Sequence, residues 1–132
     1  MSARILIVED ETLVALELQS ILLDLGYEVL GIAPDLAGAR RYFDDEFALA
    51  LVDLNLRDGL TGPQIGAQLG LNGVTVLFVT ANPRLLGSGI AGAIGVITKP
   101  TDDDMVRAAV SYALAVRSGK PAKAPPYLRL FA

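Results

Sequence analysis

Five polar residues that could do chemistry together stand at the ends of short apolar runs. They are Glu9, Asp10, Asp53, Thr80 and Lys99. Three carboxylates held close together repel one another, and a bound divalent cation relieves that repulsion. Because carboxylates offer only oxygen ligands, Mg²⁺ is the cation that we expect. The set therefore predicts a magnesium site next to an aspartate that can attack phosphorus.

Each member of the set has an expected role. Asp10 and Asp53 are the expected direct ligands of the cation, and Glu9 is expected to act through water. With the metal neutralising phosphoryl oxygens, the Asp53 carboxylate is the candidate nucleophile. Lys99 can pair with that carboxylate and afterwards with the phosphate, and the Thr80 hydroxyl can donate to a phosphoryl oxygen.

The same residues also have purely structural explanations. Glu9 and Asp10 could favour the start of a helix through its dipole. Asp53 could initiate a turn, Thr80 could cap a helix, and Lys99 could be a solvated residue at the end of a strand. The coincidence of all these residues at strand ends favours the metal and phosphate site.

Alternating strands and helices would place these residues at one edge of a sheet. The expected strands are Arg4–Val8, Glu28–Ala33, Ala48–Val52, Val74–Val79 and Gly95–Thr98. Their sequences are apolar runs, which are typical of strands covered on both faces. The alternation predicts βαβ units, and hence an α/β domain with a doubly wound, five-stranded parallel sheet. Ligands of such sheets bind beyond the carboxyl ends of the strands.

The expected helices have recognisable starts and ends. Two of them are expected at Thr12–Leu25 and Gly62–Leu71. A helix that opens at Pro34-Asp35 would have Leu36, Ala39 and Phe43 on one face. A fourth helix would start at Pro83, and the last would run from an N-cap at Thr101 to about Arg117. Gly26 suits the left-handed position that follows a helix. The three glycines between Pro83 and Ala93 predict a short or mobile fourth helix, since each costs a helix roughly 1 kcal/mol relative to alanine.

Bulk properties exclude several classes of protein. The net charge of −4 and the lack of a basic cluster argue against nucleic-acid binding. No apolar run approaches the ~20 residues of a membrane span, and no signal peptide is expected, so we expect a cytoplasmic protein without a membrane partner. The sequence has no cysteine, which excludes disulfides, and no histidine, so any phosphohistidine must belong to a partner.

The motifs at the strand ends resemble those of the receiver domain of two-component response regulators. The matching segments are Glu9-Asp10, Leu51-Val52-Asp53, Thr80-Ala81 and Thr98-Lys99-Pro100. Their order and spacing match over residues 4–118. The resemblance implies a flavodoxin-like fold with strand order 2-1-3-4-5. The small side chain of Ala81 leaves room for a phosphoryl group to enter.

The resemblance also implies a function. Asp53 would become an aspartyl-phosphate, with the phosphoryl group donated by a histidine kinase or a histidine phosphotransfer protein. The backbone carbonyl of Asn55 would complete the protein ligands to Mg²⁺, and the Lys99-Pro100 peptide bond would be cis. The chain would be a stand-alone receiver and not an enzyme, beyond assisting its own phosphorylation and dephosphorylation. Its output would be a changed contact with an unknown downstream protein, or onward transfer of the group.

Three features depart from the receiver pattern. Arg57 stands where receivers usually have a proline, and the loop before Gly62 is one residue longer than is common. Val96 replaces the usual aromatic switch residue, three positions before Lys99. The usual coupling, in which Thr80 moves and an aromatic ring rotates inward, is therefore in question for this chain.

Two other functions are compatible with parts of the sequence. Aspartate-nucleophile phosphatases of the haloacid dehalogenase type usually have Asp-x-Asp, whereas this chain has Asp53-Leu54-Asn55 and no cap domain. A phosphorylation-independent interaction module is the other alternative, against which the intact site residues argue. Leu13, Leu16 and Leu23 lie off the inward stripe of the first helix, either as part of a wide buried face or as a surface for a partner's helices.

The expected domain spans residues 1–118, followed by a tail at 119–132. The first part of the tail, rich in proline and lysine, should be extended and flexible. Its apolar end, with Tyr127, Leu128, Leu130 and Phe131, is expected to be disordered by default. The alternatives are packing back onto the domain or pairing with another subunit, which makes the chain a candidate homodimer.

Overall fold

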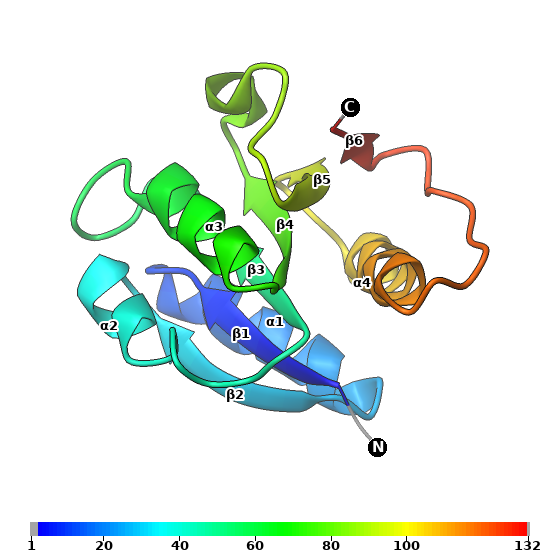
Figure 1. Ribbon diagram of the computed structural model, residues 1–132, viewed down its shortest axis with the longest axis horizontal. Helices are drawn as coiled ribbons and strands as arrows, with labels where there is room; N and C mark the ends of the chain where they lie inside the picture. Colours follow the sequence, from blue (N-terminus) through cyan, green and yellow to red (C-terminus); the bar gives the residue numbers. More distant parts are fainter. Residues whose placement is uncertain (1–2, 132) are drawn as a thin grey trace.

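The computed structural model describes residues 3–131 as one layered α/β domain built on a six-stranded sheet (Figure 1). The strands are β1 (Arg4–Val8), β2 (Glu28–Ala33), β3 (Leu49–Val52), β4 (Thr75–Thr80), β5 (Ala93–Thr98) and β6 (Arg129–Leu130). Their order is β2-β1-β3-β4-β5-β6, with the first five parallel and β6 antiparallel to β5. The predicted doubly wound sheet of order 2-1-3-4-5 is confirmed, and β6 is an addition to it.

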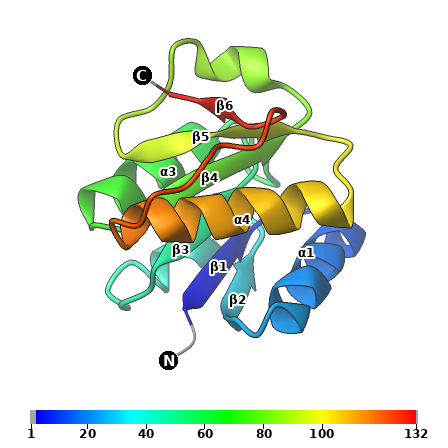
Figure 2. The same cartoon turned by 90° about the vertical axis from the view of Figure 1, so that its right-hand side faces the viewer.

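Helices cover both faces of the sheet. Figure 2 shows α1 (Thr12–Asp24) and α4 (Asp103–Arg117) in front of the sheet, with α3 (Gly62–Leu71) behind it. The short α2 (Leu36–Arg40) packs on the same face as α3, and the 3₁₀ helix η1 (Pro83–Leu86) joins β4 to β5. Within the described residues, no helix is both long enough and apolar enough to cross a membrane.

The strands are apolar throughout because both of their faces are buried. Side chains alternate along a strand, so Ile5 and Ile7 pack with α1 and α4, whereas Leu6 and Val8 pack with α2 and α3. All four side chains are fully buried. Burying one such aliphatic side chain contributes about 1.5–3 kcal/mol relative to leaving it exposed. The sheet thus forms a rigid platform for whatever follows the strand ends.

Two predicted helix boundaries are corrected. The N-cap of α4 is Asp102 and not Thr101, because the Asp102 carboxylate accepts a hydrogen bond of 2.8 Å from the backbone N–H of Met105. A carboxylate at this position also gains from the helix dipole, which a hydroxyl does not. The helix that opens at Asp35 ends at Arg40, before Phe43, and Gly38 within its five residues weakens it.

Two segments were predicted to be short, mobile or disordered, namely the helix from Pro83 and the end of the tail, and the structure agrees with only the first prediction. The helix predicted from Pro83 is short, as expected, and ends before Gly87, whose φ of +53° suits glycine. The default expectation of a disordered tail end is wrong, since Arg129 and Leu130 form β6 against β5. Packing back onto the domain, the first alternative, is what the structure shows.

Candidate functional site

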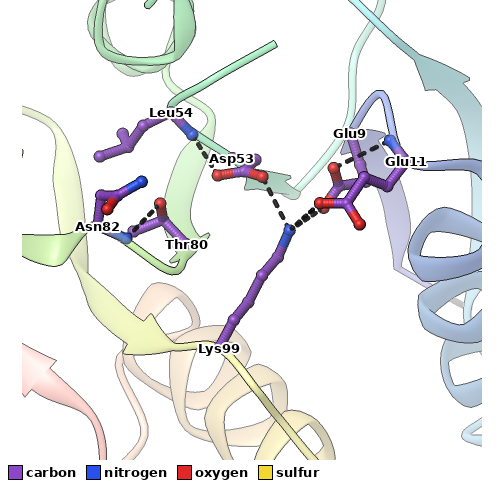
Figure 3. A network of polar contacts seen from close by, with 7 residues as sticks. All are labelled: Glu9, Glu11, Asp53, Leu54, Thr80, Asn82 and Lys99. Carbon is purple, nitrogen blue, oxygen red and sulfur yellow. Dashed lines mark hydrogen bonds and ion pairs between the residues drawn. The ribbon is translucent and has the colours of Figure 1, made fainter.

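The strand register brings the predicted site residues to one edge of the sheet. Val8 pairs with Val52 across β1 and β3, so Glu9 and Asp53, which follow them, lie side by side. Thr80 pairs with Thr98 at the ends of β4 and β5, and Lys99 comes next. Figure 3 shows the Lys99 side chain reaching from the end of β5 toward the carboxylates of Asp53 and Glu9. Parallel pairing is the reason that residues from distant parts of the sequence meet here.

Lys99 is the centre of an ion-pair network. Its Nζ atom lies 2.6 Å from Oε1 of Glu9 and 2.8 Å from Oδ2 of Asp53. It also lies 3.7 Å from Oε1 of Glu11, a residue that sequence reasoning did not include. The position of Glu11 directly after Glu9-Asp10 was the sequence feature that could have indicated its place in the site. Glu9 is only 2% exposed and Asp53 only 7%, so water solvates their carboxylates poorly. The Lys99 ammonium offsets this by supplying a positive counter-charge.

The environment shifts the pKa of both Glu9 and Lys99. Burial raises the pKa of the Glu9 carboxyl, although the hydrogen bonds from Lys99 and from the backbone N–H of Glu11 oppose the shift. Burial would lower the pKa of Lys99, but its hydrogen bonds to Asp53 and Glu9 outweigh this and raise the pKa above its ordinary value. The raised pKa of Lys99 reflects the acidic neighbours Asp53 and Glu9, so a bound cation would also be stabilised there.

The Glu9→Gln variant is expected to remove part of the pH dependence of stability. Because burial raises the pKa of Glu9 in the folded protein, its stabilising contribution is present below the unfolded-state pKa. That contribution is lost as the pH rises through the folded-state pKa. In urea unfolding with a chelator, the wild type should therefore lose stability relative to Glu9→Gln as the pH rises above the unfolded-state pKa of about 4.3. Parallel stability curves for the two proteins would contradict this.

The Asp53 carboxylate is held at both oxygens. Oδ1 accepts a hydrogen bond of 2.7 Å from the backbone N–H of Leu54, and Oδ2 is bound by Lys99. Gly62, the first residue of α3, packs against this turn, and a Cβ there would collide with the backbone of Asp53 and Leu54. A glycine is therefore required where α3 meets the end of β3. The oriented carboxylate suits a nucleophile.

Thr80 is fully buried beside this carboxylate at the end of β4. Its Oγ1 accepts a hydrogen bond of 3.1 Å from the backbone N–H of Asn82. A hydroxyl that accepts one hydrogen bond still has its own hydrogen to donate. Ala81, the next residue, is exposed. Figure 3 shows how Thr80 and Asp53 lie relative to each other. In this arrangement the Thr80 hydroxyl could donate a hydrogen bond to an oxygen atom that enters between the two residues.

Three carboxylates form a candidate metal centre. Glu9, Asp10 and Asp53 each offer one oxygen atom, and these atoms lie within 4.8 Å of one another. Glu9 and Asp53 are buried while Asp10 is exposed. An all-oxygen donor set of this kind fits a hard divalent cation such as Mg²⁺. The explanation of Glu9 and Asp10 as helix caps is less well supported, since the N-cap position of α1 is Glu11, whose side chain makes no capping hydrogen bond.

The structure also locates the remaining residues that the sequence singled out. Asn55 is exposed in the loop after Asp53, and Val96 is buried within β5. The Lys99-Pro100 peptide bond is cis. On the outer side, Leu13, Leu16 and Leu23 of α1 are 83%, 49% and 55% exposed, so they do not form a wide buried face. They leave an apolar strip open on α1.

The loop that carries Asn55 is tied to the start of α2 by side chains that sequence reasoning left out of the site. The guanidinium of Arg57 donates to Oδ2 of Asp35 at 2.9 Å, while Oδ1 of Asp35 caps α2. Oδ2 of Asp58 accepts from the backbone N–H of Leu36 at 3.1 Å, and its Oδ1 accepts from the Thr61 hydroxyl. The unusual Arg57 was the signal that this loop is held differently.

Comparisons with known proteins agree with this geometry. The response regulator receiver domain family matches residues 5–111. The phyllosphere-induced regulator PhyR of Methylorubrum extorquens is 34% identical over 118 residues, which is 86% of this chain and 44% of the relative. PhyR from Brucella abortus is 32% identical with a TM-score of 0.79, over 90% of this chain and 50% of that one.

A single-domain structure matches over nearly its whole length. The receiver domain of Erythrobacter litoralis PhyR is 31% identical with a TM-score of 0.79, over 92% of this chain and 97% of that one. The chain therefore spans about half the length of the longer PhyR relatives and nearly all of the isolated domain.

Proposed function

Because the chain belongs to the response regulator receiver domain family, we propose that it accepts a phosphoryl group on Asp53, with Mg²⁺ as its cofactor. The observation that carries this proposal is the contact of the Lys99 ammonium with Asp53 inside a cluster of three carboxylates. The negative charges of such a cluster repel one another, and a bound cation would relieve this repulsion. The cation would also neutralise the oxygens of a phosphoryl group. In this reading the protein is a phosphoacceptor that assists its own phosphorylation and dephosphorylation, and it is not a conventional enzyme.

The proposed metal ligands come from two strand ends and one loop. Asp10 and Asp53 would bind Mg²⁺ directly, the backbone carbonyl of Asn55 would complete the protein ligands, and Glu9 would act through water. When bound, the cation neutralises negative charge on the phosphoryl oxygens. The contact between Glu9 and Lys99 supports the indirect role of Glu9, since one of its oxygens is already bound by the ammonium.

The proposed transfer uses three side chains of the chain. A carboxylate oxygen of Asp53 forms a bond to phosphorus as the bond from phosphorus to the donor's imidazole nitrogen breaks. The electron pair stays on that nitrogen, which then takes up a proton. The Lys99 ammonium would pair first with the Asp53 carboxylate and then with a phosphoryl oxygen. The Thr80 hydroxyl would donate a hydrogen bond to a second phosphoryl oxygen. Ala81, exposed beside Thr80, would leave space for the group.

The donor and the output belong to partner proteins. The sequence has no histidine, so a phosphohistidine donor must be a histidine kinase or a histidine phosphotransfer protein. The exposed strip of Leu13, Leu16 and Leu23 on α1 is the proposed contact for the donor's helices. The phosphorylated form would change its contacts with a downstream protein, in the cytoplasm. We propose residues 1–118 as the receiver unit, with 119–132 as its extension.

The similarity to PhyR bears on this proposal only in part. A PhyR from Bartonella quintana that is 29% identical to this chain is described as an anti-anti-sigma factor. The match covers 50% of that chain, so we transfer to this protein only the role of a receiver domain.

The proposal is tested by phosphorylation with a small phosphodonor. The protein is incubated with acetyl phosphate and either Mg²⁺ or a chelator, and its intact mass is measured. A gain of one phosphoryl group that requires Mg²⁺ is expected. No gain with Mg²⁺, or an equal gain with the chelator, would rule out the proposed site.

The Arg57→Ala variant is expected to bind Mg²⁺ more weakly while remaining folded. Loss of the ion pair with Asp35 frees the loop that carries the proposed carbonyl ligand at Asn55. An ion pair at the surface contributes little, so the dissociation constant should rise only about two- to fivefold. Isothermal titration with Mg²⁺ measures it. The Arg107→Ala variant, which removes an exposed ion pair with Asp24, should bind as the wild type does. Equal constants in all three proteins would show that the loop needs no such tie.

A further inference from the structure

The segment after α4 returns to the sheet and closes the free edge of β5. Figures 1 and 2 show it running past α4 and ending beside β5 and the segment around η1, residues 82–89, called the η1 region here. Gly95 pairs with Leu130 and Val96 pairs with Arg129 in antiparallel register. The backbone N–H of Phe131 donates to the carbonyl of Ile94 at 3.1 Å. β6 therefore occupies an edge that a parallel five-stranded sheet would leave open.

The domain is shaped to receive this strand. A Cβ at Gly95 would collide with the backbone of Arg129, and a Cβ at Gly89 would collide with the ring of Phe131. The Phe131 ring lies 6.4 Å from that of Phe78, centroid to centroid, in the apolar layer that also contains Val96. Leu128, just before β6, is buried against the opposite layer. The two glycines thus make room for side chains and backbone from more than 30 residues later in the sequence.

Arg129 ties β6 to the η1 region. Its guanidinium donates to the carbonyl of Gly87 at 3.0 Å and to the carbonyl of Pro83 at 3.2 Å. The same guanidinium lies 5.4 Å from the centre of the Phe131 ring, within the range of a cation–π contact. The position of η1 and the attachment of β6 are therefore linked through one side chain.

The η1 region begins two residues after Thr80, the proposed phosphate-binding residue. The backbone N–H of Asn82, one residue before η1, donates to Oγ1 of Thr80. Rotation of the Thr80 hydroxyl toward a phosphoryl group on Asp53 would take this acceptor away from Asn82. A short covalent path then leads from Asn82 to Pro83, whose carbonyl is held by Arg129.

We propose that β6 is a detachable strand whose hold on β5 is controlled by phosphorylation of Asp53. The inference rests on the proposed function, because it begins with the movement of Thr80 toward the phosphoryl group. Loss of the hydrogen bond to Asn82 loosens the η1 region, the carbonyls of Pro83 and Gly87 leave Arg129, and β6 separates from β5. The edge of β5 and the space filled by Phe131 then become a surface that the unphosphorylated protein conceals.

Amide hydrogen exchange of the whole protein tests the proposal. Exchange is compared with and without acetyl phosphate and Mg²⁺, and the intact mass of each sample reports phosphoryl uptake. We expect phosphorylation to accelerate exchange in the peptide containing Leu130 and Phe131 by about tenfold, since local opening sets the rate. Exchange in β3 should stay unchanged. In Asp53→Asn the phosphodonor should change neither region.

Variants separate the tie from the rest of the domain. Arg129→Ala should show fast exchange at Leu130 and Phe131 before any phosphorylation, whereas Lys123→Ala, an exposed position in the same segment, should match the wild type. A protein that gains the phosphoryl group by mass without faster exchange at Phe131 would overturn this inference and leave the proposed function intact. Absence of phosphoryl uptake would overturn both. Wild-type exchange in Arg129→Ala would show that Arg129 does not hold the strand.

Discussion

Asp53→Asn is expected to abolish phosphoryl uptake completely. The amide of asparagine is not a nucleophile toward phosphorus, and it also removes one of the negative charges that a cation needs. The side chain has nearly the same shape, so the hydrogen bond from the backbone N–H of Leu54 to its oxygen can be kept. The variant should therefore fold like the wild type and show no mass gain after incubation with acetyl phosphate and Mg²⁺.

The matched control for this prediction is Asp45→Asn. Asp45 is an exposed aspartate that lies near Ala3 and Arg4, at the opposite ends of the strands. Its loss changes the net charge by the same amount as the loss of Asp53, so any effect of charge alone appears in both variants. Full uptake in Asp45→Asn and none in Asp53→Asn would assign the modification. Uptake of equal extent in the Asp53 variant would place the phosphoryl group on another residue.

Lys99→Met is expected to cause the largest loss of stability among the site variants when Mg²⁺ is absent. Methionine keeps an apolar side chain of similar length but leaves the buried carboxylates of Glu9 and Asp53 without their counter-charge. Removing one partner of a buried ion pair costs about 3–5 kcal/mol, and protonation of Glu9 with partial access to water should reduce this to about 2–3 kcal/mol. Urea unfolding near neutral pH with a chelator measures the change.

Addition of Mg²⁺ makes this prediction specific for the site. A cation bound between the carboxylates replaces part of the missing positive charge, so the stability difference between Lys99→Met and the wild type should narrow as Mg²⁺ is added. The exposed Lys120 provides the control, and Lys120→Met should match the wild type under both conditions. A Lys99 variant as stable as the wild type in chelator would show that the carboxylates do not depend on the ammonium.

Most of the fold follows from local patterns in the sequence. Continuous apolar runs such as Leu49–Val52 have the composition of strands buried on both faces, and the intervening helical patterns require parallel crossovers. Parallel strands all end at the same edge, so the meeting of Asp53, Thr80 and Lys99 is a consequence of strand ends that are visible in the sequence. The structure brings them together as expected, and their roles in phosphoryl transfer stay predictions.

Details within the site needed the three-dimensional structure. Three acids were available to Lys99 from the first strand end, and the sequence does not say that it pairs with Glu9 and approaches Glu11. Which carboxylate is buried next to the ammonium depends on how the chain turns after β1. The tie between Arg57 and Asp35 similarly joins residues 22 positions apart, and neither residue has a local pattern that names the other.

The sequence by itself determined the parallel sheet and the edge at which the acidic and basic residues gather, because these depend on hydrophobic periodicity within each segment. The order of the strands was implied only by the resemblance to receiver domains. The tertiary structure alone decided that Arg129 and Leu130 form a sixth strand. Two residues carry too little periodicity to predict a strand. Their pairing depends on an open edge at β5, on the space left by Gly89 and Gly95, and on the carbonyls of Pro83 and Gly87, which accept hydrogen bonds from Arg129. These features become complementary only when distant segments are folded together.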